Sequence, residues 1–385
     1  MIKNPAKAKI LEKNYSLLPH YPIILRFTSA RLDHSALSHC RLVMNISSLL
    51  RDTLAQVTGS IPTGKYGCEQ SRSCFPIDTP ATFFYDFPAI MIITHDTPPE
   101  PWTDKAKSKG LFVTDLDGTL LRSDRTFAEC DLNALKKLGE LHITRAIATG
   151  RSIFSFNTVA DSRLPVDYVI FSTGAGVVHF PSGKLVKDIS LKESEVERAT
   201  HVLLTAQLDF MIHQPIPENH KFAYVALNSG NTDFDHRISL YQPYAQPLED
   251  TTDAFGPATQ LIAVLPPSQD KSILDDIRKK LSDFNVIQTT SPLDGKSTWI
   301  EIFPATVSKS LTAQWLAMQL NVEPQHIVSL GNDYNDLDLL EWSQTRYVVD
   351  NAPADLKLRF PSVASNDNGG VAEAVERWLA KMASS

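Results

Sequence analysis

The sequence has few cysteines, little excess charge and no long uninterrupted apolar run. Only four cysteines occur in 385 residues, unlike the dense framework of a disulfide-stabilised secreted domain. The net charge of −7 argues against a nucleic-acid binder that relies on broad phosphate neutralisation. The apolar stretch 81–93 is interrupted by Asp86 and Pro88 and is too short to span a bilayer. We therefore expect a cytoplasmic protein without a nucleic-acid or membrane partner.

Two patterns in the first quarter of the chain are incomplete versions of ligand-binding motifs. Cysteines and histidines occur there without the paired C-x₂₋₄-C spacing of a zinc site; they are His34, His39, Cys40, Cys68 and Cys74. Residues 59–65 match most of a P-loop, but Tyr66 stands where Mg²⁺ binding requires Ser or Thr. Neither pattern predicts a site. Residues 1–107 are interpreted as a poorly patterned N-terminal extension.

From Gly110 the chain alternates between strand and helix patterns. The apolar runs 110–116, 143–148 and 168–171 predict buried strands. Thr126 is the expected N-cap of a helix that continues to Leu141. Strands that alternate with helices predict a parallel sheet with right-handed crossovers. Ligands bind at the carboxyl ends of such strands, where polar residues occur in this sequence.

A segment of different character interrupts this rhythm. Residues 184–297 mix hairpin, helix and strand patterns, whereas helix and strand patterns alternate again from about residue 307. The sequence therefore predicts an α/β fold with a discontinuous Rossmann-like parallel sheet core, residues 108–183 and 298–385. Residues 184–297 are the expected inserted α+β module.

Asp115 and Asp117 are the first functional candidates. Two carboxylates this close repel each other unless a cation or a proton-transfer task holds them together. Gly118 allows a tight turn in which backbone N–H groups face an anion. The alternative is an Asx turn that closes a strand with solvated acids. Taken alone, Thr149 would be a helix N-cap and Lys309 a solvated helix lysine.

Four motifs follow one another in a fixed order: Asp115-x-Asp117-Gly-Thr, Thr149-Gly-Arg, Lys309, and Gly331-Asn-Asp-Tyr-Asn-Asp336. In this order they resemble the four motifs of the haloacid dehalogenase-like superfamily. The insertion between the second and third motifs resembles the Cof-like, type IIB branch with its C2 cap. The resemblance extends over residues 110–385.

The resemblance implies a role for each motif. Asp115 is the expected nucleophile, which forms an aspartyl-phosphate. Asp117 would protonate the leaving oxygen and then deprotonate the attacking water. The phosphate-binding residues implied are Thr149, Gly150, Lys309 and Asn335. Arg151 is either a site residue or the partner of a surface acid, and Thr173 stands where the branch commonly has Asn.

The implied cofactor is Mg²⁺, since an anionic nucleophile must approach an anionic phosphate. The expected ligands are Asp115, Asp117 through its backbone carbonyl, and acids of the fourth motif. Here Asn332 replaces the first acid of that motif. Either its amide oxygen binds the metal, or Asp333 takes over; Asp336 completes the candidate set. One fewer charge is expected to weaken Mg²⁺ binding.

The sequence thus predicts a Mg²⁺-dependent phosphatase, a phosphoric monoester hydrolase acting on a small phosphorylated metabolite such as a sugar phosphate. The cap is expected to close over the site. Its polar residues His213, Asn228, Asn231 and His236 are interpreted as loop or surface residues, and Trp299 and Phe303 as core. Two alternatives stay open: a phosphomutase of related fold and a non-catalytic metabolite-binding protein. The sequence does not specify an oligomeric state.

Overall fold

The computed structural model describes residues 14–16, 22–24, 108–248, 255–269 and 272–383. The chain separates into two units, Met1–Thr82 and Phe83–Ser385. In the first unit, β1 (Asn14–Ser16) pairs antiparallel with β2 (Pro22–Ile24). The incomplete zinc and P-loop patterns lie outside the described residues, as does the rest of the expected extension.

The larger sheet contains the strands that carry the catalytic motifs, and we call it the core sheet. β14, β3, β4 and β5 pair in parallel, with β15 and β16 beyond β14, and β6 and β7 add antiparallel strands at the other edge. In spatial order the strands are β16 (Ser362–Val363), β15 (Thr345–Val349), β14 (Ile327–Gly331), β3 (Leu111–Thr114), β4 (Thr144–Ala148), β5 (Tyr168–Phe171), β6 (Gly176–His179) and β7 (Lys184–Asp188). The predicted α/β fold class is confirmed.

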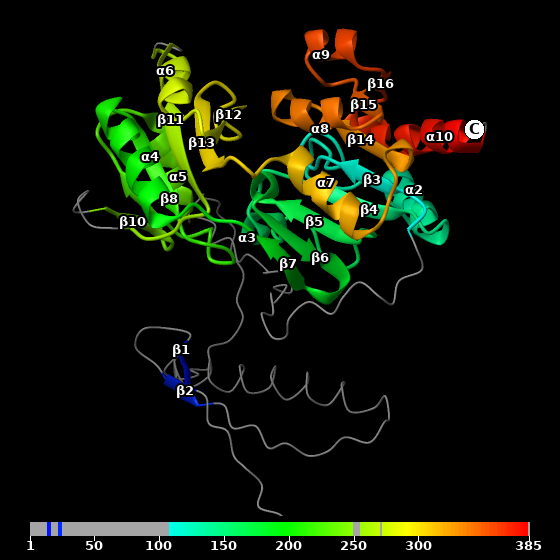
Figure 1. Cartoon of the computed structure of the whole chain (residues 1–385), viewed down its shortest axis with the longest axis horizontal. Coiled ribbons are helices and arrows are strands. Elements are labelled where there is room, and N and C mark those ends of the chain that lie inside the picture. Colours follow the sequence, from blue (N-terminus) through cyan, green and yellow to red (C-terminus); the bar gives the residue numbers. More distant parts are fainter. Residues whose placement is uncertain (1–13, 17–21, 25–107, 249–254, 270–271, 384–385) are drawn as a thin grey trace, which may run out of the picture. The chain divides into compact units, whose positions relative to one another are not determined.

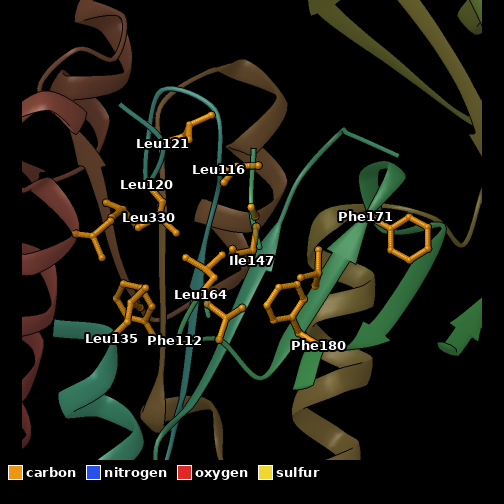
Figure 2. Close-up of a cluster of buried hydrophobic side chains, with 14 of the residues drawn as sticks. Phe112, Leu116, Leu120, Leu121, Leu135, Ile147, Leu164, Phe171, Phe180 and Leu330 are labelled. Atoms are coloured by element: carbon orange, nitrogen blue, oxygen red, sulfur yellow. The ribbon is translucent and has the colours of Figure 1, made fainter. Parts of the chain in front are cut away.

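Helices cover both faces of the core sheet. α2 (Glu129–Glu140) and α10 (Gly370–Ala383) pack against one face. α7 (Lys309–Gln319) and α8 (Leu337–Trp342) cover the other. Figure 2 shows the first of these cores, where Leu135 of α2 lies against Phe112 of β3. Burying one such side chain stabilises the fold by about 1.5–3 kcal/mol. The shorter helices are α3 (Ile153–Phe156) and α9 (Ala354–Arg359).

The smaller sheet, which we call the cap sheet, is formed by the inserted segment. Its spatial order is β10 (Ala245–Pro247), β9 (Phe222–Val225), β8 (Asp209–His213), β11 (Gln260–Leu265), β13 (Thr298–Pro304) and β12 (Phe284–Thr290). α4 (Glu193–Thr205) and α6 (Ser272–Lys280) pack against one face of it, and α5 (Thr232–Leu240) packs against the other. Figure 1 shows β13 leading from this sheet into α7.

Two strands belong to a different sheet from the one expected. β7 was expected in the cap, but it pairs with β6 in the core sheet because Gly183 closes a hairpin with φ +66°. β13 was expected in the core, but it pairs with β11 and β12 in the cap sheet. By strand pairing, the cap thus begins after Asp188 and ends at Pro304. We propose the core–cap division with these limits.

The start of α2 also differs from the expectation. Thr126 is not its N-cap, because its backbone N–H and its hydroxyl both donate to Asp124 Oδ1, at 3.0 and 2.6 Å. This Asx turn delays the helix, which begins at Glu129. Within the described part of the chain, no helix is long and apolar enough to cross a membrane.

We predict that protonation of His213 destabilises the cap at acidic pH. His213 is buried on β8, and its Nδ1 lies 2.8 Å from the Asn219 carbonyl oxygen. Burial, with Arg237 nearby, lowers its pKa to about 3, against about 6.5 in an unfolded chain. The unfolded state therefore binds more protons between these values, and stability falls by about 1.4 kcal/mol per pH unit as the pH drops below about 6.5.

The measurement is the unfolding free energy of the wild type and of His213→Gln between pH 7.5 and 4.5. Glutamine retains a donor for the Asn219 carbonyl but does not titrate. The wild type should show a steeper loss of stability over this range than the variant. Parallel pH profiles for the two proteins would contradict the prediction.

Candidate active site

Three segments that are distant in sequence meet at the buried ammonium group of Lys309. Its Nζ lies 2.7 Å from Asp115 Oδ1 and 2.5 Å from Asp336 Oδ1. Lys309 and Asp336 have no exposed surface, and Asp115 is 4% exposed. Lys309 is therefore not a solvated helix lysine, and its role in a site stays a prediction.

Local structure brings each of these groups to the same edge of the core sheet. Asp115 follows directly after β3, and its backbone N–H donates to the Leu330 carbonyl of the adjacent β14. Lys309 is the first residue of α7, whose N-cap Ser308 accepts from Leu311 N at 3.1 Å. Asp336 lies in the turn after β14. The carboxyl ends of β3 and β14 therefore carry the acids, as parallel strands allow.

Burial and charge act in opposite directions on this cluster. Burial raises the pKa of Asp115 above its ordinary value, Asp336 adds to the effect, and Lys309 opposes it. Burial alone would lower the pKa of Lys309, but the two carboxylates outweigh burial and raise it. Lys309 therefore stays charged. A buried cation bonded to two acids is costly to desolvate, and such a pair is strongly destabilised when one partner is removed.

The turn after Asp115 brings an amide against the second oxygen of that carboxylate. The Thr119 hydroxyl lies 3.1 Å from Asp115 Oδ2. Gly118 has φ +74°, and a Cβ there would lie 2.6 Å from the Asn332 amide, so glycine permits this approach. The terminal amide atom of Asn332 that faces the turn lies 3.2 Å from Asp115 Oδ2 and 3.1 Å from the Asp117 carbonyl oxygen, which favours nitrogen at this position.

These groups fit a hard cation. Within the described residues, no three His, Cys, Asp or Glu side chains group to hold a metal by themselves. The donors that converge are instead a carboxylate oxygen of Asp115, the Asp117 carbonyl and the amide of Asn332. Oxygen donors of this kind suit Mg²⁺, with waters completing the octahedron. Rotating the Asn332 amide by half a turn would present its oxygen to the cation instead of its nitrogen.

The other two metal candidates of this loop have different partners. Asp336 Oδ2 accepts from the backbone N–H groups of Asn332 and Asp333, at 2.8 and 3.2 Å. Asp333 Oδ1 accepts from Tyr334 N at 2.7 Å. Burial raises the pKa of Asp333, while the Tyr334 hydrogen bond opposes the shift. Of the two alternatives left open by the sequence, the placement favours Asn332 as the ligand.

Asp117 points to a different partner from Asp115. Arg151 binds it with two nitrogens, each 2.7 Å from one carboxylate oxygen. Burial disfavours the charged form of Arg151, but the hydrogen bond and the charge of Asp117, with smaller contributions from Tyr241 and Asp115, raise its pKa. Asp117 is half exposed. Arg151 was expected either in the site or as the partner of a surface acid. Its partner is Asp117, the second acid of the first motif.

Thr149 and Gly150 form a turn that fits an anion. Thr149 is buried, and its Oγ1 accepts from Arg151 N at 3.1 Å, which leaves its hydroxyl hydrogen able to donate elsewhere. Gly150 is exposed, and a Cβ there would meet only Thr173 Oγ1, at 3.7 Å. Open space above a backbone turn at the start of a helix suits a phosphoryl oxygen.

Asn335 is the predicted phosphate-binding residue that the structure places apart from the others. Among the described residues it forms no hydrogen bond with the other candidates. It lines a cavity of about 420 Å³. The cavity lies between β12 of the cap sheet and the starts of α7 and α8, and Asn335 is the one predicted site residue in its lining.

The cap sheet touches the core beside this site. Asn219 Nδ2 donates to Ser172 Oγ at 2.7 Å. The Thr173 hydroxyl lies 3.4 Å from Glu301 Oε2 of β13, and the Thr173 N–H donates to the Thr149 carbonyl at 3.0 Å. Thr173 has φ +57°, a costly conformation for a β-branched residue that occurs mainly at functional positions.

Several residues of this region are not among the predicted site residues. Thr119 ends the first motif, and its hydroxyl contacts Asp115. Asn351 donates to the Gly118 carbonyl at 2.8 Å, and Glu301 is an isolated acid in an apolar strand. Of the polar cap residues expected at loops or the surface, His213 is instead buried on β8, and Asn231 is buried and donates to Asp209 at 2.8 Å.

Comparison with known proteins identifies the family. Residues 112–375 match the model of the haloacid dehalogenase-like hydrolases. The chain belongs to this family. The expected resemblance is therefore confirmed, and the chain is an enzyme of the hydrolase class.

Relatives of known name are similar over most of their length. The chain is 25% identical over 281 residues to 5-amino-6-(5-phospho-D-ribitylamino)uracil phosphatase YwtE of Bacillus subtilis, covering 69% of this chain and 96% of YwtE. It is 26% identical over 284 residues to the putative phosphatase YxeH of the same organism, covering 70% and 99%. The expected enzyme class, a phosphoric monoester hydrolase, agrees with these names.

Solved structures show the same fold. The phosphatase BT1666 of Bacteroides thetaiotaomicron matches with a TM-score of 0.59 and 19% identity, over 74% of this chain and 99% of that one. The subclass IIB sugar phosphatase BT4131 matches with a TM-score of 0.54 and 14% identity, over 70% and 98%. At these identities the likeness supports the fold, including an inserted cap.

We predict that Lys309→Met lowers the free energy of unfolding by about 3–5 kcal/mol, because it leaves two buried carboxylates without their cation. Urea unfolding would measure this loss. The double variant Lys309→Met, Asp336→Asn should regain part of it, since one of the two acids is then neutral. Lys280→Met, at an exposed lysine of α6, is the control and should change stability by less than about 0.5 kcal/mol. A single variant as stable as the control would refute the prediction.

Proposed function

We propose that this chain hydrolyses small phosphorylated metabolites in a Mg²⁺-dependent reaction through an aspartyl-phosphate. The observation that carries the proposal is Asp115, a buried carboxylate at the end of a central strand, with a lysine on one oxygen and the metal-donor groups beside the other. Thr149 and Gly150 offer donors for the phosphoryl oxygens. The family and the names of the relatives support hydrolysis of a phosphate ester.

In the first step, Asp115 attacks phosphorus. Its Oδ2 faces Asn332 and the Asp117 carbonyl, so Oδ1, next to Lys309, is the oxygen proposed to form the new bond. Lys309 and the Thr149 hydroxyl would stabilise the charge of the transferring phosphoryl group. Asp117 would protonate the leaving oxygen. The alcohol then leaves, and the phosphoryl group stays on Asp115.

In the second step, water replaces the alcohol. Asp117 now acts as a base, takes a proton from the water and directs it to phosphorus, which releases phosphate and restores Asp115. Arg151 holds both oxygens of Asp117, and one of these two hydrogen bonds must break before Asp117 carries the proton for the leaving oxygen. Contacts of the cap with Ser172 and Thr173 would help exclude bulk water.

Asp115, the Asp117 carbonyl and Asn332 are the residues proposed to hold Mg²⁺. When bound, the ion would offset the negative charges of Asp115 and of the substrate phosphate. Asp336 is proposed to support this site indirectly, since it fixes Lys309 and the backbone of residues 332 and 333.

A panel of phosphate esters, assayed by phosphate release with and without Mg²⁺, tests the proposal. We expect turnover of p-nitrophenyl phosphate and of some sugar phosphates with Mg²⁺, and loss of turnover with a chelator. Asp115→Asn should lower kcat by at least about 10³-fold, since asparagine has the same shape but is not a nucleophile. Because the variant also removes one of the two acids bonded to Lys309, its thermal unfolding is measured so that the assay is run where it is folded.

Asp124→Asn is the matched control, because Asp124 is an exposed acid just beyond the same turn. It should retain wild-type turnover. An active Asp115→Asn variant would refute the assigned nucleophile. Absence of turnover under every condition would favour a metabolite-binding protein, and transfer to a second sugar hydroxyl rather than to water would favour a phosphomutase.

Asn332→Asp should strengthen Mg²⁺ binding by about tenfold or more, because it adds a negative charge among the donor groups. The measurement is the Mg²⁺ dissociation constant by calorimetry, with the Mg²⁺ dependence of turnover as a second readout. Asp333→Asn serves as the comparison, since Asp333 is engaged with Tyr334. If Asp333→Asn abolished Mg²⁺ binding while Asn332→Asp left it unchanged, Asp333 would be the ligand instead.

A further inference from the structure

The two faces of the cap sheet differ in composition. One is apolar throughout, and the other combines an apolar cluster with polar side chains. α4 and α6 cover the apolar face with a continuous hydrophobic cluster. On the other face, α5 packs over Met211, Phe222 and Trp299. The same face carries His213, Gln260 and Glu301 by strand alternation, and α5 adds Arg237. The polar part of this face lies toward Thr173 of the core, which contacts Glu301.

Arg237 is a cation without a counter-ion in contact. Within the part of the chain that the structure describes, its guanidinium donates no hydrogen bond and forms no ion pair, and its Nε is buried without a partner. Its Cζ lies 4.6 Å from the centre of the Trp299 ring and 5.0 Å from that of Tyr241. Aromatic faces attract a cation, but they accept few of the five N–H donors of a guanidinium.

The nearby acids are already engaged. Asp233 accepts from Ser291 Oγ at 2.7 Å and from Trp299 Nε1 at 2.6 Å. Glu301 lies within hydrogen-bonding distance of the Thr289 and Thr173 hydroxyls, at 3.3 and 3.4 Å. Neither carboxylate lies within ion-pair distance of Arg237. Asp233 also fixes the Trp299 ring on which the guanidinium stacks.

Arg237 is placed near the catalytic groups through β13. Its guanidinium lies over the Trp299 ring, and Trp299 and Glu301 are two residues apart on the same face of that strand. Glu301 contacts Thr173, whose backbone N–H donates to the Thr149 carbonyl. Arg237 therefore lies on the face of the cap sheet that carries the contact with the phosphate-binding candidates.

We propose that Arg237 binds a second anionic group, a carboxylate or a second phosphate, on the leaving group of the substrate. The inference rests on the proposed phosphatase function and specifies its substrate class. A planar guanidinium binds such groups with two parallel hydrogen bonds, and here Trp299 and Tyr241 hold its plane. Thr149 and Lys309 would bind the phosphate that is removed, and Arg237 the anionic group that stays on the product.

Matched pairs of esters test this inference. Two pairs differ by a carboxylate: 3-phosphoglycerate against glycerol 3-phosphate, and 6-phosphogluconate against glucose 6-phosphate. One differs by a phosphate: fructose 1,6-bisphosphate against fructose 6-phosphate. In at least one pair we expect kcat/KM of the wild type to be about 10- to 100-fold higher for the ester with the second anion, the range for a hydrogen bond to a charged group. The pair that shows the preference identifies the anion.

Variants of two cap arginines assign the preference. Arg237→Met should bring the ratio of kcat/KM between the two esters of a pair close to one. Arg237→Lys should keep part of the preference for the second anion, because lysine keeps the charge but not the planar guanidinium. Arg198→Met is the matched control. Arg198 also stacks on a ring, Phe284 at 4.5 Å, but it lies on α4 and pairs with the exposed Asp283. Its loss should leave the ratio unchanged.

Calorimetry on Asp115→Asn, with and without Arg237→Met, separates binding from catalysis. Tighter binding of the ester with the second anion, lost in Arg237→Met, supports the anion site even if the wild type releases no phosphate. Such binding without phosphate release would contradict the proposed phosphatase function but not the anion site. Equal turnover and equal binding within every pair, or a preference that survives Arg237→Met, would overturn the inference. Thermal unfolding of each variant confirms that the fold is retained.

Discussion

The ammonium group of Lys309, buried between Asp115 and Asp336, is the interaction on which the rest of the site depends. It joins the ends of two neighbouring strands to the start of α7. Desolvating three charges is unfavourable, and only close geometry offsets the cost. That requirement fixes the positions of β3, β14 and α7 relative to one another. It also fixes the loop after β14, because Asp336 uses its second oxygen to hold two backbone N–H groups.

This arrangement leaves the proposed Mg²⁺ ligands with little negative charge. The Lys309 ammonium group binds Asp115 Oδ1 and Asp336. The groups beside Asp115 Oδ2 are the Asp117 carbonyl and the amide of Asn332. An amide binds a cation less strongly than a carboxylate, but it also repels an approaching phosphate less. As a ligand in the proposed site, Asn332 would therefore shift the balance from metal affinity toward admission of the anionic substrate.

The sequence predicted the features that are encoded locally. A strand that ends in two acids, and four motifs in order, predicted that Asp115 and Lys309 belong to one site, and their charged groups lie 2.7 Å apart. The membership of β7 and β13 in their sheets was not predictable, because strand patterns do not specify partners. Thr126 was misassigned since an Asx turn competes with a helix cap. Arg237 and Glu301 belong to no motif, and the roles proposed for them rest on their tertiary neighbours alone.

Glu301 connects the recognition of the leaving group to the catalytic core. β13 is the strand that returns the chain to the core, and its inward acid meets Thr173, a β-branched residue held at φ +57°. The backbone of Thr173 is in turn bonded to that of Thr149. A change in the position of β13 would therefore reach the proposed phosphate-binding turn through the contacts Glu301–Thr173 and Thr173–Thr149. The cost of the left-handed conformation is consistent with selection for this geometry, because packing alone would favour a residue that adopts it without strain.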